Sequence, residues 1–342
     1  MKHEVLVKAQ LEEAFKKQFE CDNVCMVSNG THAIEVLLTA MDLPRGAKVL
    51  VPELSFLATA TAVARCGLIP VFADVSRDYM GLTLDSLKAI HLNQSLSAVI
   101  VVHLAGFINR ELKAIAQYCR ENHLPLIEDC AQIHDGYYKG VRAGNIGDAA
   151  TFSFQSSKLF NSGEGGAIIS RNSALILQCK AIINWGWPGE NMAAQLDIPS
   201  SNYRLSYLQC ERLISEFSLA DSKVAALRKF YGEIAQMATQ LEKTFLPASF
   251  NGDYIDCPFF FMVTACQPLH QLEPRSQYPM SRSTVVLAIL RKWFPDLVAP
   301  YREANHASSN NINSSHIVGH YAFLRISQFT DIGSIESELQ KL

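Results

Sequence analysis

The sequence predicts an α/β fold with a mainly parallel sheet covered by helices on both faces. Short, continuously apolar segments alternate with helical patterns over most of the chain, which is typical of strands buried on both sides. Hydrophobic residues make up 49% of the 342 residues and charged residues only 18%, so a large core can form. Polar residues follow several of the apolar segments, and ligands gather at such strand ends in sheets of this kind.

The predicted elements follow from hydrophobic spacing along the chain. They are a helix over 9–19, a helix over 33–41, a strand over 48–51, a helix over 56–66, a strand over 69–72, a strand over 98–103, a helix over 111–121, a strand over 125–128, a strand over 149–154 and a strand over 166–170. Parallel strands end at the same edge of a sheet, so Asp74, His103 and Asp129 are expected to lie at one edge.

The rest of the chain predicts a second, smaller domain. Residues 205–246 carry a long helical pattern without proline, which indicates one or two helices that bridge to it. We therefore expect a large domain over 1–220 and a small C-terminal domain of mixed helices and strands over 221–342. The Ser/Asn-rich segment 308–315 predicts a surface loop.

Composition argues against several classes of protein. A net charge of −3 disfavours a nucleic-acid-binding surface, and no apolar run approaches the roughly 20 residues of a membrane span. Acidic residues among the first lysines argue against a signal peptide. Nine cysteines without paired spacing predict reduced thiols and a cytoplasmic location. Cys21 and Cys25 lack a second pair and are interpreted as packing residues, so no metal is expected.

The first candidate site is Ser28–Asn29–Gly30–Thr31–His32, which opens a helix. Backbone N–H groups and the positive dipole end at a helix start suit a phosphate, although Ser, Thr and Asn are also ordinary helix caps. The segment is not a P-loop, and the chain lacks the G-x-G-x-x-G fingerprint of dinucleotide-binding folds.

Three further polar segments carry candidate chemistry. Asp129 ends an apolar strand, where it either caps the next element or serves as a buried carboxylate that pairs with a cation. Lys158 lies among small residues in a loop, where a desolvated lysine becomes a nucleophile, although most lysines are simply solvated. Ser201 and Asn202 precede the long helical region, and either could cap it.

Taken together, these features predict pyridoxal 5'-phosphate (PLP) as the cofactor. A phosphate cradle, a buried carboxylate, a reactive lysine and an aromatic residue, Phe56, are what that group requires. The lysine forms a Schiff base, and the carboxylate keeps the pyridine nitrogen protonated so that the ring accepts electrons.

In combination, the motifs resemble the DegT/DnrJ/EryC1/StrS family of PLP-dependent sugar aminotransferases over about residues 10–230. The residues that carry the resemblance are Gly30–Thr31, Pro52, Phe56, Glu128–Asp129–Cys130–Ala131–Gln132, Gly144, Gly147–Asp148, Phe152–Ser153–Phe154, Lys158, Gly163–Glu164–Gly165–Gly166 and Asn202–Tyr203–Arg204–Leu205. The resemblance implies a three-layer PLP-transferase fold of type I, with a smaller C-terminal α+β domain. It also implies a homodimer with shared active sites.

The resemblance assigns a role to each matching residue. Lys158 carries the cofactor, Asp129 contacts the pyridine nitrogen, and Gln132 lies near the phenolic oxygen, where many relatives have His. Phe56 stacks on the ring. The expected phosphate cradle consists of Gly30, Thr31, the His32 amide and Ser153, with Asn202 reaching the phosphate of the other subunit.

The implied reaction moves an amino group from glutamate to a keto sugar, carried on a nucleotide; an aminocyclitol acceptor is an alternative. Two other classes remain open: a PLP- or PMP-dependent sugar dehydratase, in which His typically replaces the lysine, and a non-catalytic regulatory relative. The chain departs from the family pattern in having fewer residues before the first helix. It also has Trp185–Gly186 where His–Gly is common, and a poorly matching C-terminal third.

Overall fold

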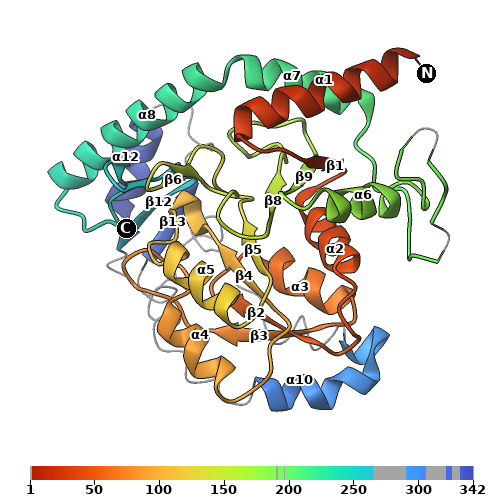
Figure 1. Ribbon diagram of the computed structural model, residues 1–342. Helices are drawn as coiled ribbons and strands as arrows, with labels where there is room; N and C mark the ends of the chain where they lie inside the picture. Colours follow the sequence, from red (N-terminus) through yellow and green to blue (C-terminus); the bar gives the residue numbers. More distant parts are fainter. Residues whose placement is uncertain are drawn as a thin grey trace.

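A seven-stranded sheet forms the centre of the computed structural model, which describes residues 2–189, 192–195, 197–264, 290–305, 321–325 and 332–341 (Figure 1). The strand order is β1–β9–β8–β5–β4–β2–β3. All neighbours are parallel except that β9 runs antiparallel to β1 and β8, so the predicted mainly parallel sheet is confirmed. The strands are β1 (Val24–Val27), β2 (Lys48–Pro52), β3 (Ile69–Ala73), β4 (Ala98–Val102), β5 (Leu126–Asp129), β8 (Ala149–Ser153) and β9 (Gly166–Ser170).

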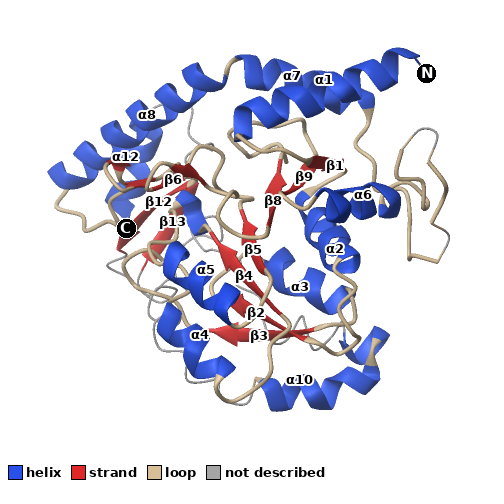
Figure 2. Cartoon of the chain, in the orientation of Figure 1, coloured by secondary structure: helices blue, strands red, loops and turns tan. Residues whose placement is uncertain are grey.

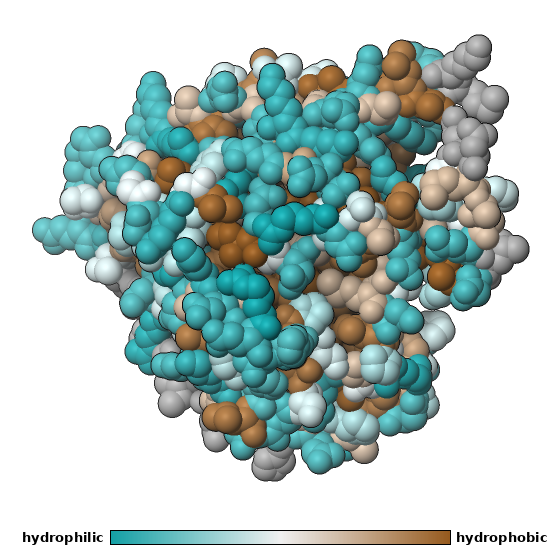
Figure 3. All heavy atoms as spheres, in the orientation of Figure 1, coloured by the Kyte–Doolittle hydropathy of each residue, from teal (hydrophilic) through white to brown (hydrophobic). Residues whose placement is uncertain are grey.

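Helices cover both faces of this sheet because its strands are apolar on both sides. In Figure 2, α2 and α3 lie to the right of the sheet and α4 and α5 to its left, while α1 and α7 cross the top of the view. The helices of this part are α1 (Lys2–Phe19), α2 (Gly30–Ala40), α3 (Leu57–Arg65), α4 (Leu84–His91), the 3-10 turn η1 (Leu104–Gly106), α5 (Leu112–Glu121), α6 (Ser173–Ile182) and α7 (Tyr207–Ser218). The molecular face in Figure 3 is mostly hydrophilic, with apolar side chains showing in small groups.

The remaining described elements form smaller layers beside the main sheet. They are α8 (Ala220–Gln240), η4 (Pro295–Leu297), α10 (Val298–Ala304), α12 (Ile332–Lys341), the antiparallel pair β12 (Phe260–Thr264) and β13 (Tyr321–Arg325), and the antiparallel sheet β10 (Phe250–Asn251), β11 (Tyr254–Ile255), β6 (Tyr137–Tyr138) and β7 (Val141–Arg142). A second core joins α8, β12, β13 and α12 around Tyr231 and Phe261, which is an α+β arrangement. Val224, near the start of α8, belongs to the main core instead. The division at residue 220 stays a prediction.

Several described elements were not predicted from the sequence. These are β1, α4, α6 and the two-residue strands β6 and β7. The expected bridging region forms two helices, but neither Ser201 nor Asn202 caps α7; Ser206 and Gln209 do so through a capping box. The predicted loop at 308–315 lies outside the described residues. Within the described part of the chain, no helix is long and apolar enough to cross a membrane.

Candidate active site

The turn between β1 and α2 forms one end of the site. Asn29 caps α2, because its side-chain oxygen accepts the backbone N–H of His32 at 2.8 Å. Gly30 begins the helix against the end of β8, where a Cβ at residue 30 would lie 2.8 Å from the Cβ of Ser153. Only glycine permits this close approach, which places the Ser153 hydroxyl beside the positive end of the helix.

Asp129 ends β5 and is 4% exposed. One carboxylate oxygen accepts the hydroxyl of Thr59 at 2.9 Å, and the other accepts the backbone N–H of Ala131 at 3.1 Å. Burial raises the pKa of Asp129, although these bonds and the charge of Lys158 oppose the rise. The alternative role of Asp129 as a helix cap does not apply, since residues 130–136 form no helix. Its bond to the Ala131 N–H instead stabilises the turn after β5.

Lys158 lies in the loop after β8 and is partly buried. Its backbone N–H donates to the carbonyl of Gln155 at 2.8 Å. Its ammonium nitrogen lies 4.2 Å from the centre of the Phe259 ring, which is a cation–π distance. Lys158 is therefore in contact with a residue about one hundred positions later in the sequence.

Gln132 and Phe56 occupy opposite kinds of environment. Gln132 is buried, and its side-chain oxygen accepts the N–H of Ala105 at 2.7 Å. Phe56 precedes α3 at its N-cap position and is 48% exposed. An exposed phenyl group at the mouth of a cavity is available to stack on a flat ligand.

A cavity of about 730 Å³ brings most of the predicted residues together. It is lined by Gly30, Thr31, His32, Phe56, Asp129, Gln132, Ser153 and Lys158. Asn202 does not line it: this residue is exposed and pairs with Asn184 through an isolated bridge. Sequence reasoning missed Thr59 and Phe259, which also line the cavity. Neither lies in a recognisable motif, and nothing in the sequence brings Phe259 to Lys158.

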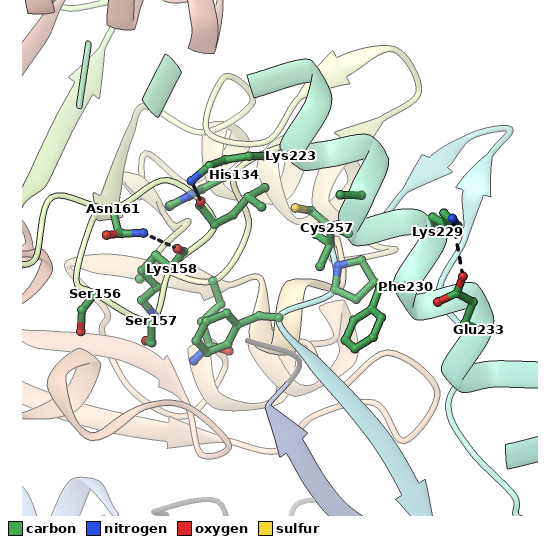
Figure 4. Close-up of a pocket in the computed structure, with 17 residues that line it drawn as sticks. His134, Ser156, Ser157, Lys158, Asn161, Lys223, Lys229, Phe230, Glu233 and Cys257 are labelled. Carbon is green, nitrogen blue, oxygen red and sulfur yellow. Dashed lines mark hydrogen bonds and ion pairs between the residues drawn. The ribbon is translucent and has the colours of Figure 1, made fainter. Parts of the chain in front are cut away.

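A second cavity of about 620 Å³ lies on the other side of Lys158, against α8. Figure 4 shows Lys158, Ser157 and Asn161 on one side of it and Lys223 and Phe230 of α8 on another (Figure 4). The two cavities share Ala131, Gln132, Ser157, Lys158 and Phe259. Lys158 is therefore accessible from two directions.

Next to Asp129, three buried side chains lie close enough together to suggest a metal site: His103, Glu128 and Cys130. The Glu128 carboxylate, however, already accepts the His103 ring N–H at 3.0 Å and backbone N–H groups of Gly144, Ile146 and Gly147. Burial also raises the pKa of the Cys130 thiol well above its usual value, which disfavours the thiolate that metals bind. The cluster therefore fits a structural hydrogen-bond network rather than a metal site.

Comparison with known proteins places the chain among aminotransferases. The sequence profile of the DegT/DnrJ/EryC1/StrS aminotransferase family matches residues 7–266. The chain is similar to GDP-perosamine synthase of Vibrio cholerae, with 26% identity over 306 residues that span 80% of this chain and 82% of that protein. It is 36% identical over 148 residues to L-glutamine:2-deoxy-scyllo-inosose aminotransferase of Streptomyces fradiae, but this match spans only 43% of the chain and 34% of that relative.

The fold is also shared with solved structures. The structure of 3-amino-5-hydroxybenzoic acid synthase superimposes with a TM-score of 0.80 at 20% identity, covering 97% of this chain and 88% of that one. At this identity the likeness establishes the fold, which confirms the predicted fold type I architecture.

Proposed function

Because the chain belongs to the DegT/DnrJ/EryC1/StrS aminotransferase family, we propose that it binds PLP in the 730 Å³ cavity and transfers an amino group from glutamate to a keto sugar. The family is PLP-dependent, and the chain is an aminotransferase of that class. The acceptor is proposed to be carried on a nucleotide, as the name of the Vibrio cholerae relative suggests.

One observation carries this proposal: an amine, a buried carboxylate, a phosphate cradle and an exposed aromatic ring line the same cavity. Asp129 is the last residue of β5, and Lys158 lies in the loop after β8, the adjacent parallel strand. The absence of a Cβ at Gly30 lets the Ser153 side chain lie against the N-terminus of α2, so its hydroxyl and the backbone N–H groups of the helix start can serve the same phosphate. The residues therefore fit the cofactor that the family uses.

When bound, PLP supplies an electron sink that stabilises negative charge at the substrate carbon. Asp129 would hold a proton on the pyridine nitrogen, and Thr59 and Ala131 fix the orientation of its carboxylate. Phe56 would stack on one face of the ring. Lys158 Nζ would hold the group covalently and, as a free amine, would move the proton to and from the substrate carbon as general base and acid.

We propose further that the protein is a homodimer in which Asn202 reaches the phosphate of the partner subunit. Asn202 is exposed. The ring of its chain neighbour Tyr203 packs against the ring of His32 in the cradle, with the ring centroids 4.5 Å apart. Large apolar side chains are exposed around this segment, including Trp185 at 52% and Leu208 at 61%. Grouped exposed apolar side chains are typical of protein–protein interfaces.

A spectrum and a substrate panel test the function. Purified protein with PLP should show a visible absorption band, and borohydride should then fix the cofactor to the peptide that contains Lys158. Glutamate and nucleotide-linked 3- or 4-keto sugars should give 2-oxoglutarate and an amino sugar, whereas glutamine or a keto-cyclitol as the better substrate would shift the proposal toward the inosose-type reaction. Absence of the band would favour a regulatory relative, and loss of a sugar hydroxyl without amino transfer would favour a dehydratase.

A further inference from the structure

His134 is a buried histidine to which no role has been given. It follows β5, is 3% exposed and lines the second cavity behind Lys158 (Figure 4). Its Nε2 lies 2.9 Å from the carbonyl oxygen of Ser153, and its Nδ1 lies 3.2 Å from the backbone nitrogen of Phe160. Both ring nitrogens are therefore engaged with the main chain.

These two partners fix the protonation state of the ring. A carbonyl oxygen only accepts and a backbone N–H only donates, so Nε2 carries the proton and Nδ1 carries none. Burial, together with the nearby charge of Lys158, lowers the pKa of His134 to about 3. A neutral ring can thus lie near Lys158 without repelling its ammonium group.

The two bonds span the segment that carries the reactive lysine. Ser153 is the last residue of β8, and Phe160 follows Lys158, so one imidazole ties both ends of the segment 153–160. The ring also stacks on Phe160, with an interplanar angle of 11° and a centroid distance of 5.3 Å. Within the segment, Lys158 is held by its backbone bond to Gln155.

We propose that His134 is a positioning residue for Lys158. Its neutral ring holds the two ends of the segment 153–160 together, which we call closure of the segment, and thereby sets the position from which the lysine reaches the cofactor. The catalytic part of this inference rests on the proposed function, but the closure of the segment does not. A histidine that only fills the core would affect stability alone. A positioning residue would also affect the dynamics of the segment and the chemistry of the lysine.

The variants separate hydrogen bonding from packing. His134→Gln keeps one donor and one acceptor, whereas His134→Phe keeps aromatic packing but loses both bonds. Phe217→Leu is the matched control, because Phe217 packs against the Phe154 and Phe160 rings at 6.0 and 5.7 Å but bonds neither end of the segment. None of these variants removes a residue proposed to touch the cofactor.

Hydrogen exchange in the cofactor-free protein tests the closure directly. Amides of the segment 153–160 should exchange about tenfold faster in His134→Phe than in wild type, and within about threefold of wild type in His134→Gln, as expected for the loss or retention of main-chain bonds. Phe217→Leu should leave this exchange near the wild-type rate. Equal exchange in all proteins, or equal acceleration in His134→Phe and Phe217→Leu, would overturn the proposal.

A second measurement tests the effect on Lys158. With PLP added, His134→Phe should shift the pH midpoint of the visible band and lower kcat by about tenfold or more with little change in KM, and His134→Gln should recover most of both. An unshifted midpoint together with an unchanged kcat would refute the positioning role. If wild type shows no band, the proposed function fails while the exchange result still decides the closure. If His134→Phe does not fold, His134→Asn, which is too short to serve both partners, takes its place under the same criteria.

Discussion

Substitution of Gly30 tests the phosphate cradle most directly, because the structure shows what an added methyl group would meet. The Cβ of alanine at this position would lie 2.8 Å from the Cβ of Ser153 and 3.1 Å from its Oγ, inside the 3.4 Å at which ordinary contact begins. Neither residue can move easily, since Ser153 belongs to a central strand of the sheet and residue 30 is the first residue of α2. Gly30→Ala must therefore push the helix start away from β8.

The expected magnitude follows from two opposing effects. Overpacking a tight contact costs about 1–3 kcal/mol, and replacing glycine by alanine in a helix returns about 0.5–1 kcal/mol. Gly30→Ala should thus lower the free energy of unfolding by up to about 2.5 kcal/mol. A displaced cradle also loses a charge-assisted hydrogen bond to phosphate, worth about 1.5–3 kcal/mol, which weakens cofactor binding roughly 10- to 140-fold.

Denaturant unfolding of the cofactor-free protein and a spectroscopic titration with PLP measure the two effects separately. Gly232→Ala in α8 is the control, because its added Cβ would meet no described atom within 4 Å apart from its chain neighbours and its own helix backbone. This control should stabilise the protein by about 0.5–1 kcal/mol and leave the PLP affinity unchanged. Wild-type stability and affinity in Gly30→Ala would refute the cradle at this helix start.

Three further results are expected. Burial raises the pKa of Asp129, so its ionised form destabilises the cofactor-free protein at neutral pH. Asp129→Asn should therefore resist urea better than wild type near pH 7, although its turnover should drop by orders of magnitude. The difference in stability should shrink as the pH falls through the raised pKa of Asp129 and vanish below the unfolded-state pKa of about 4. A difference that is independent of pH would contradict this. Lys158→Ala should lose the visible band and turnover but still bind PLP non-covalently; a borohydride adduct on another lysine in wild type would show that the assignment is wrong. Mixing inactive Lys158→Ala and Asn202→Ala proteins at limiting cofactor should restore up to about a quarter of wild-type activity. Half of the randomly paired dimers are mixed, and each mixed dimer has one intact site of two. No recovery after verified subunit exchange would show that Asn202 serves the site of its own subunit.

Much of the sheet and of the cavity lining could be predicted from local patterns. Asp129 and Ser153 lie at the ends of apolar strands, and parallel neighbours bring such ends together. Thr59 could not be predicted, because a threonine in a helix of small residues carries no signal of a carboxylate partner. Phe259 could not be predicted either: Cys257 and Phe259 donate backbone hydrogen bonds to the turn after β4, and this pairing between distant segments brings the Phe259 ring to Lys158.

The adjacent carboxylates of β5 show how the fold separates structural from chemical roles. Burial by itself raises the pKa of both residues, yet the His103 bond and the backbone N–H groups bring the pKa of Glu128 below its usual value. Among the described residues, Asp129 accepts hydrogen bonds from Thr59 and Ala131 alone, and its pKa remains raised. Glu128 is thus satisfied within the protein, whereas ionised Asp129 gains from one more donor or cation on its cavity side. A protonated pyridine nitrogen would be that donor, so the residue that destabilises the cofactor-free protein is the one that a bound cofactor would stabilise.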